Sequence, residues 1–424
     1  MRRGIAATAL IAALAMTASA CGGDDDGQNG AEGGGKELSG TVTFWDTSNE
    51  AEKATYQALA EGFEKEHPKV DVKYVNVPFG EANAKFKNAA GGNSGAPDVM
   101  RTEVAWVADF ASIGYLAPLD GTAALDAESD YLPQAAASTR YEGKTYAVPQ
   151  VIDTLALFYN KKLLNKAGVR APASVAELKT AAAKITEKTG ATGLYLRGDD
   201  PYWFLPYLYG EGGDLVDEKS RTVTVDDAAG VKAYAVLKDL VDSKAAITDA
   251  SDGWNNMENA FKSGKVAMML NGPWAIEDVR AGTEFKDAAN LGVAPVPAGT
   301  ARQGSPQGGW NLSVYAGSKN LNASYAFVKY MSSAKVQQQT TEKLSLLPTR
   351  ASVYEVPAVA DNEMVKFFKP AVDKAVERPW IAQGNALFEP IRLQMANVLS
   401  GKTSPQKAAA NTGDAYRKLL KDYK

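Results

Sequence analysis

Three short segments place a large aromatic residue beside Asp, Asn, Gly or Pro, outside any regular apolar pattern. They are Asn271-Gly272-Pro273-Trp274-Ala275, Asp199-Asp200-Pro201-Tyr202-Trp203-Phe204 and Gly308-Gly309-Trp310-Asn311. An aromatic ring can cover the apolar C–H face of a pyranose, while carboxylates and amides form hydrogen bonds with its hydroxyls. The segments are typical of a site for a neutral sugar, although an aromatic residue near a turn more often fills the core.

Trp274 is the clearest of these residues. It follows the apolar run 266–270, which Gly272 and Pro273 end, and it stands at the start of a predicted helix. The position separates its side chain from the apolar run and favours a ring on the wall of a site.

The residue types needed for most catalysis are scarce. His67 is the single histidine and lies at a charged helix end beside Pro68, while Cys21 is the single cysteine. Neither a zinc site nor a Ser-His or Cys-His nucleophile can be assembled from them. Paired carboxylates could hydrolyse a glycosidic bond, but 50 Asp and Glu residues make such pairs common by chance. We expect no catalytic residue, metal ion or cofactor.

Strand-like and helix-like stretches alternate along the chain and must position the aromatic segments. Strands are predicted at 41–45, 70–75, 145–148, 155–159 and 266–270, and helices at 51–66, 174–188, 226–242, 323–331 and 390–399. This order predicts an α/β fold with two lobes.

Residues 1–21 are typical of a bacterial lipoprotein signal. Arg2 and Arg3 precede an apolar run at 5–16 that is too short to span a bilayer, and Ala18-Ser19-Ala20-Cys21 forms the processing site. Cys21 is the expected lipidation site, although such sites usually carry Leu where this chain has Ala18. The Arg pair leaves both the Sec and the twin-arginine export routes open.

Residues 22–40 are rich in Gly and acidic residues and predict a flexible tether with a reach of roughly 25 Å. The composition of the chain is that of a globular protein: 45% of residues are hydrophobic, 23% are charged, and the formal net charge is −4. The length suggests two domains, and no basic excess indicates nucleic acid as a partner.

Five segments, in this order and spacing, resemble one known family. They are Gly95–Val99, Tyr141–Pro149, Leu157–Leu164, Ala260–Met268 and Asn271–Ala275. From Thr41 to the C-terminus the chain resembles the extracellular solute-binding proteins of sugar ABC importers, specifically the maltose and maltodextrin binders.

The resemblance implies a two-lobe periplasmic-binding-protein fold with a hinge and a ligand cleft between the lobes. The expected lobes comprise residues 41–150 with 311–355 and residues 153–307 with 358–424. A hinge would close the lobes on maltose or a malto-oligosaccharide, and the loaded protein would dock on an ABC permease. We expect a monomer held by its lipid at the extracytoplasmic face of the cell membrane.

The resemblance also assigns roles to individual residues. Trp274 and Tyr202 match the stacking aromatics of the family, and Phe388 falls where maltose binders usually hold a tryptophan. Asp153 matches an acidic hydroxyl acceptor, and Asn49 and Glu50 match a polar pair after the first strand.

The segment 101–106 departs from the pattern of enterobacterial maltose binders. There we assign Arg101 and Glu103 to sugar hydroxyls, and we add Trp310 from its own glycine-rich segment. Because of this departure, trehalose, cellobiose and oligosaccharide analogues remain alternative ligands. A glycoside hydrolase and a sugar-sensing module remain alternative functions.

Overall fold

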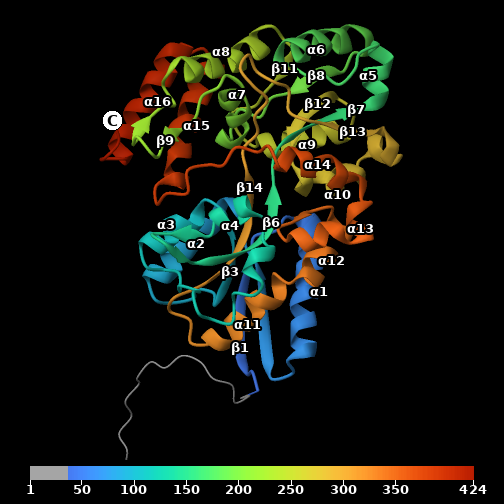
Figure 1. Ribbon diagram of the computed structural model, residues 1–424. Helices are drawn as coiled ribbons and strands as arrows, with labels where there is room; N and C mark the ends of the chain where they lie inside the picture. The colour runs from blue at the N-terminus through green and yellow to red at the C-terminus, as the bar shows by residue number, and fades with distance from the viewer. Residues whose placement is uncertain (1–36) are drawn as a thin grey trace, which may run out of the picture. The chain divides into compact units, whose positions relative to one another are not determined.

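Two β-sheets organise residues 37–424, which are the part of the chain described by the computed structural model (Figure 1). The predicted signal, Cys21 and tether residues 22–36 lie outside this part. The first sheet has the strand order β15-β6-β14-β3-β1-β2. Its strands are β1 (Gly40–Asp46), β2 (Val70–Asn76), β3 (Val99–Glu103), β6 (Ala147–Asp153), β14 (Gly308–Val314) and β15 (Leu347–Pro348).

The second sheet has the order β11-β8-β12-β7-β13. Its strands are β7 (Ala156–Asn160), β8 (Thr192–Tyr195), β11 (Ala246–Ile247), β12 (Val266–Asn271) and β13 (Leu291–Ala294). Two small hairpins lie outside the main sheets: β4 (Arg140–Tyr141) with β5 (Lys144–Thr145), and β9 (Val216–Asp217) with β10 (Thr222–Val223). We call the parts built on the two main sheets the first and second lobes.

The chain passes between the sheets more than once. β6 of the first sheet leads through Thr154 and Leu155 into β7 of the second, and residues 295–307 return the chain from β13 to β14. β6 and β14 pair antiparallel where they leave the first lobe (Figure 1). Each lobe is therefore built from separated segments. β6 ends at Asp153 and β14 begins at Gly308, where the chain passes from one sheet to the other.

Helices cover both sheets. The α-helices are α1 (Glu50–Glu66), α2 (Phe79–Gly91), α3 (Trp106–Ser112), α4 (Pro133–Ala137), α5 (Lys161–Ala167), α6 (Val175–Thr189), α7 (Leu205–Gly210), α8 (Ala228–Asp242), α9 (Gly253–Lys262), α10 (Ile276–Arg280), α11 (Leu321–Met331), α12 (Ala334–Leu344), α13 (Pro357–Ala360), α14 (Glu363–Val372), α15 (Phe388–Leu399) and α16 (Pro405–Leu419). The short 3-10 helices are η1 (Glu128–Asp130), η2 (Pro201–Trp203), η3 (Pro273–Ala275), η4 (Thr283–Phe285), η5 (Ala288–Asn290), η6 (Ala351–Glu355) and η7 (Gly384–Leu387). The predicted α/β class with two lobes is confirmed.

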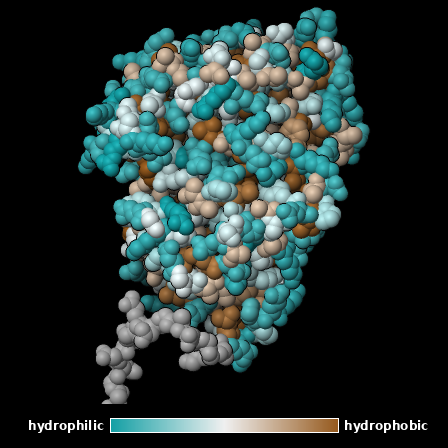
Figure 2. All heavy atoms as spheres, in the orientation of Figure 1, coloured by the Kyte–Doolittle hydropathy of each residue, from teal (hydrophilic) through white to brown (hydrophobic). Residues whose placement is uncertain are grey.

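Side-chain periodicity explains how the first sheet is covered. Along β1, Phe44 packs in one apolar cluster with Phe63 and Phe327, while the next residue, Trp45, packs on the opposite face with Phe86. This alternation is that of a strand buried on both faces. The second lobe has its own core, and the view in Figure 2 is mostly hydrophilic with scattered apolar residues. Between residues 37 and 424, no helix is both long and apolar enough to cross a bilayer.

The second sheet requires a residue without a side chain at Gly193 in β8. A Cβ atom there would clash with the backbone and side chain of Ala182 in α6. We predict that Gly193→Ala lowers the free energy of unfolding by about 1 to 3 kcal/mol through overpacking. Gly80→Ala in α2 is the matched control, since nothing lies within 4 Å of the added methyl group. Chemical denaturation measures both, and equal stability of Gly193→Ala and wild type would contradict this account of the packing.

Candidate functional site

Trp274 lies between the two lobes. It belongs to η3, directly after β12, and its half-buried ring packs against the apolar clusters of both lobes. A Cβ atom at Gly272 would overlap the indole ring, so glycine at that position permits the ring to fold back over the chain. The backbone carbonyl of Trp274 accepts a hydrogen bond from Asn49 Nδ2 of the first lobe at 3.1 Å.

The rings of Tyr202 and Trp203 lie beside Trp274. Each has its centroid 6.4 Å from the Trp274 centroid, with interplanar angles of 57° and 80° respectively. Asp200 caps η2 by accepting a hydrogen bond from the Tyr202 backbone, which explains the polar start of this aromatic segment. The guanidinium of Arg197 lies 4.3 Å from the centroid of Trp203. Local turns thus bring together two aromatic segments that are separated by about 70 residues in the sequence.

Asp153 lies at the end of β6, opposite Gly308 of β14. A side chain at Gly308 would collide with the Asp153 carboxylate and the Tyr202 hydroxyl, so the glycine lets these two groups approach. Asp153 is 4% exposed, and its carboxylate has no hydrogen-bond partner among residues 37–424. Burial raises its pKa to about 8, and the Glu103 carboxylate adds to this rise while Arg378 opposes it. The group is available to accept hydroxyl hydrogen bonds.

Glu103 and Arg378 form an ion pair beside Asp153. Arg378 Nη2 donates to Glu103 Oε1, and Arg378 Nε donates to the Gln307 carbonyl at 2.9 Å. The Arg378 guanidinium also lies 5.4 Å from the centroid of Tyr202 and 5.6 Å from that of Phe388. A single buried cation thus connects a first-lobe carboxylate with two second-lobe rings.

Trp310 provides an aromatic surface in the first lobe, and Arg101 packs against its ring. The Arg101 guanidinium lies 4.3 Å from the centroid of Trp310 and 4.6 Å from that of Tyr56. Arg101 is fully buried, donates to Gln150 at 3.0 Å and lies 3.5 Å from Glu52. The structure therefore places Arg101 behind this surface as a support for Trp310, in contrast to the direct hydroxyl contact predicted from the sequence.

Phe79 and Trp106 extend this surface. Their rings stack with centroids 5.3 Å apart and an interplanar angle of 12°, and both meet Trp310 edge to face. Trp106 Nε1 donates across the lobes to Asn385 Oδ1 at 3.1 Å. Phe79 remains 51% exposed, which is unusual for a ring of its size and fits a position on a surface that a ligand could cover.

The structure separates the predicted pair Asn49 and Glu50. Asn49 accepts a hydrogen bond from the Glu52 backbone, which caps α1, and its Nδ2 atom reaches Trp274. The Glu50 side chain is 85% exposed and lies 3.6 Å from Lys53. Glu50 therefore points to solvent, away from the other predicted residues.

The predicted residues that come together are Trp274, Tyr202, Asp153, Glu103, Phe388, Trp310 and Asn49. Sequence reasoning did not assign a role to Arg378, Trp106 or Phe79. Trp106 and Phe79 carried no local signal beyond their aromatic type, and Arg378 lies far from its partners in the sequence. Among the described residues, no cluster of three His, Cys, Asp or Glu side chains could hold a metal ion.

Comparison with known proteins places this site in a family. Residues 47–338 match the family model of bacterial extracellular solute-binding proteins. The chain belongs to this family. Its members bind solutes outside the cytoplasm and are not enzymes, which confirms the predicted non-enzymatic class and extracytoplasmic location.

Three relatives illustrate the similarity. The GacH receptor of Streptomyces glaucescens, solved unliganded and with acarbose or an acarbose homolog, is 92% identical over 92% of this chain and all of its own, with a TM-score of 0.91. The maltotriose-binding protein of Pyrococcus abyssi is 27% identical over 80% of this chain and 73% of its own length. The diacetylchitobiose-binding protein DasA of Streptomyces coelicolor is 28% identical over 99% of both chains. The predicted two-lobe solute-binding fold is confirmed.

We predict that sugar binding depends on pH through the titration of Asp153. Sugar hydroxyls that donate to Asp153 favour its ionised form, so a bound sugar lowers the pKa from about 8. Affinity should then be highest above pH 8 and fall as the pH drops, by up to about tenfold per pH unit. Glu103, Arg378, Arg101 and Glu52 also act on this carboxylate.

Calorimetry from pH 5.5 to 8.5 measures this dependence. Asp153→Asn should bind more weakly at high pH and show a much flatter profile. A wild-type affinity that does not change with pH would contradict a contact between the sugar and the Asp153 carboxylate.

Proposed function

We propose that this protein is the substrate-binding component of a carbohydrate ABC importer. It captures maltodextrin-type oligosaccharides and delivers them to a membrane permease. The observation that carries the proposal is the juxtaposition of the Trp274 and Tyr202 rings with the buried carboxylate of Asp153, which has no hydrogen-bond partner among residues 37–424. The binding of acarbose or its homolog by the GacH receptor and the name of the maltotriose-binding protein support the choice of sugar.

In this proposal, aromatic rings and polar side chains recognise different parts of the sugar. Stacking on Trp274 selects the apolar face of a pyranose, while Asp153 and Glu103 accept hydrogen bonds from its hydroxyls. Arg378 neutralises the charge of Glu103, its ion-pair partner, and burial disfavours a charge on Asp153, so the site favours a neutral ligand over a cationic one. These contacts come from both lobes, so one sugar can bridge them.

Lobe closure supplies the mechanism of capture. Hydrogen bonds and ion pairs that join the lobes around the site include those of Asn49 with Trp274, Trp106 with Asn385, and Glu103 with Arg378. A sugar that contacts both lobes stabilises this closed arrangement, because only there are all its contacts made. The closed protein is the form we expect the permease to recognise.

Acarbose is a second candidate ligand. The 92% identity to the GacH receptor favours it over sugars chosen from the more distant relatives. Calorimetry with acarbose, maltotriose, diacetylchitobiose, trehalose and cellobiose would rank the candidates. The proposed maltodextrin class would be wrong if maltotriose bound no more tightly than cellobiose.

Two experiments address the other functions. Incubation with maltotriose followed by chromatography would reveal smaller sugars if the protein were a glycoside hydrolase. Deletion of the gene should abolish sugar uptake if the protein serves a transporter, whereas a sensing module would leave uptake intact.

Trp274 should supply a large part of the binding free energy. Truncation of a buried aromatic anchor typically costs about 2 kcal/mol or more, so Trp274→Ala should weaken maltotriose binding by roughly 30-fold. Trp274→Phe should lose less, because the smaller ring still covers part of the sugar. The midpoint of unfolding is measured beside the affinity. A folded Trp274→Ala protein with wild-type affinity would contradict a ligand contact at Trp274. A variant that loses stability but keeps its affinity would show that the ring serves the fold only.

We also propose that the protein is anchored to the membrane by a lipid on Cys21. The arginines, the apolar run and the small residues before Cys21 support this anchor. Cys21→Ser should release the protein into the medium, as measured by fractionation of cells. Mature Cys21→Ser protein that stayed in the membrane would contradict the lipid anchor while leaving the sugar-binding proposal intact.

A further inference from the structure

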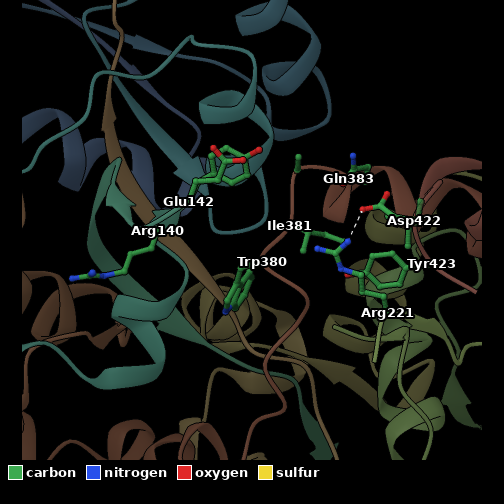
Figure 3. Close-up of a pocket in the computed structure, with 11 residues that line it drawn as sticks. Arg140, Glu142, Arg221, Trp380, Ile381, Gln383, Asp422 and Tyr423 are labelled. Carbon is green, nitrogen blue, oxygen red and sulfur yellow. Dashed lines mark hydrogen bonds and ion pairs between the residues drawn. The ribbon is translucent and has the colours of Figure 1, made fainter. Parts of the chain in front are cut away.

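Glu258 is a buried carboxylate that takes no part in the site described above. It belongs to α9, is 2% exposed, and does not line the cavity of about 420 Å³ that lies between the β4–β5 hairpin and the C-terminal residues (Figure 3). Its Oε1 atom accepts a hydrogen bond from Asn271 Nδ2 at 2.6 Å, whereas its Oε2 atom has no hydrogen-bond partner among residues 37–424. A carboxylate buried in this way is costly, and an apolar side chain would fill the same space at lower cost. Packing alone therefore does not account for a carboxylate at this position.

Asn271 connects Glu258 to the turn that carries Trp274. It is fully buried at the end of β12, and its Oδ1 atom accepts a hydrogen bond from the Gly272 backbone N–H at 2.9 Å. The Trp274 ring lies directly over Gly272, since a Cβ atom there would overlap the indole. The Glu258 carboxylate thus holds the Asn271 amide, and that amide holds the Gly272 peptide. The Trp274 ring rests on this peptide.

A second contact from α9 supports the same turn. Trp254 lies one helical turn before Glu258, and its ring centroid is 6.3 Å from that of Trp203. Trp203 Nε1 donates to the Leu270 carbonyl at 2.7 Å, near the end of β12, and the Trp203 centroid lies 6.4 Å from that of Trp274. The end of β12 and the Trp274 ring are thus both held from α9.

The charge state of Glu258 shows which substitution preserves its contact. Burial raises its pKa to about 7, and the nearby Asp278 adds to this rise. The hydrogen bond from Asn271 and the charges of Lys262 and Arg197 oppose it. A neutral carboxyl is therefore well populated at neutral pH, and both forms can accept from Asn271. Glutamine has the shape of the neutral carboxyl and keeps an acceptor, whereas leucine leaves the Asn271 amide without one.

We propose that Glu258, acting through Asn271, is a positioning residue that sets the orientation of the Trp274 ring. The inference rests on the proposed function, in which Trp274 stacks on the sugar, and deepens it: a residue that never touches the sugar controls the affinity. Because the effect passes through one ring, Glu258 matters for binding only while that ring is present. A carboxylate that served the fold alone would act in the same way with or without the ring.

A double-mutant cycle with Trp274→Ala tests this coupling, with maltotriose affinity measured by calorimetry. Glu258→Leu should weaken binding by roughly 3- to 10-fold, because Asn271 loses its acceptor and the turn is no longer fixed. In the Trp274→Ala background the same substitution should change the affinity by less than about twofold, since residues that act as one unit are not additive. Glu258→Gln should retain most of the wild-type affinity.

The indole N–H signal of Trp274 in the magnetic resonance spectrum gives a readout that needs no sugar. In isotope-labelled protein, Trp274→Phe identifies the signal by its loss. Glu258→Leu should shift or broaden it, while the signal of Trp45 in the first-lobe core stays in place. Glu258→Gln should leave both signals unchanged. Asn271→Asp keeps the acceptor for Gly272 but loses the donor to Glu258, and it is a second variant with the same expected direction, should Glu258→Leu fail to fold.

Asn290→Ala is the control for a general loss of stability. Asn290 is 3% exposed in the second lobe, where it accepts from the Lys162 N–H at 2.9 Å and donates to the Glu284 carbonyl at 2.8 Å. Its loss should lower the midpoint of unfolding while the maltotriose affinity and the Trp274 signal stay as in wild type.

Two results would overturn the positioning role and leave the proposed function standing. One is an equal loss of affinity from Glu258→Leu with and without the Trp274 ring. The other is an unmoved Trp274 signal or wild-type affinity in the folded Glu258→Leu and Asn271→Asp proteins. If wild type did not bind maltotriose, the proposed function would fail, and the indole signal would still decide whether Glu258 orients the ring.

Discussion

The buried ion pair between Arg378 and Glu103 is the interaction on which the geometry of the site most depends. It joins the two lobes at the point where the aromatic rings of the second lobe meet the carboxylates of the first. Loss of one partner from a buried pair typically costs about 3 to 5 kcal/mol, because a charge is left without compensation. A lobe movement that separated Glu103 from Arg378 would replace their ion pair by hydration of both groups, so the pair fixes how the lobes meet at this point without adding much net stability.

Small residues allow the charged and aromatic groups to approach this pair. Gly308 admits the Asp153 carboxylate and the Tyr202 hydroxyl, and Gly272 admits the Trp274 ring. Any side chain at either position would force these groups apart. The glycines that looked like simple turn signals in the sequence therefore determine how closely rings and carboxylates pack.

Local sequence signals predicted the α/β class with two lobes, and they singled out two of the aromatic residues that the structure brings together. Trp274 and Tyr202 could be predicted because each follows a turn that its own neighbours determine. Arg378 could not, because its role comes from Glu103, which lies 275 positions away along the chain. The residue types of Arg101 and Glu50 suit sugar binding, but residue type alone does not determine where a side chain points. Packing places Arg101 behind Trp310, and the Glu50 side chain points to solvent.

The same packing supports the proposal that a sugar could draw the lobes together although the site is rich in charge. Asp153 is buried without a hydrogen-bond partner among the described residues, and burial raises its pKa to about 8. A carboxylate in that state is costly until hydroxyl donors replace the lost water. Under the proposed function, a sugar would supply those donors and at the same time cover the rings of Trp274 and Tyr202. Under this proposal, the polar contacts of Asp153 in the first lobe and the ring contacts of Trp274 in the second favour the same arrangement of the lobes.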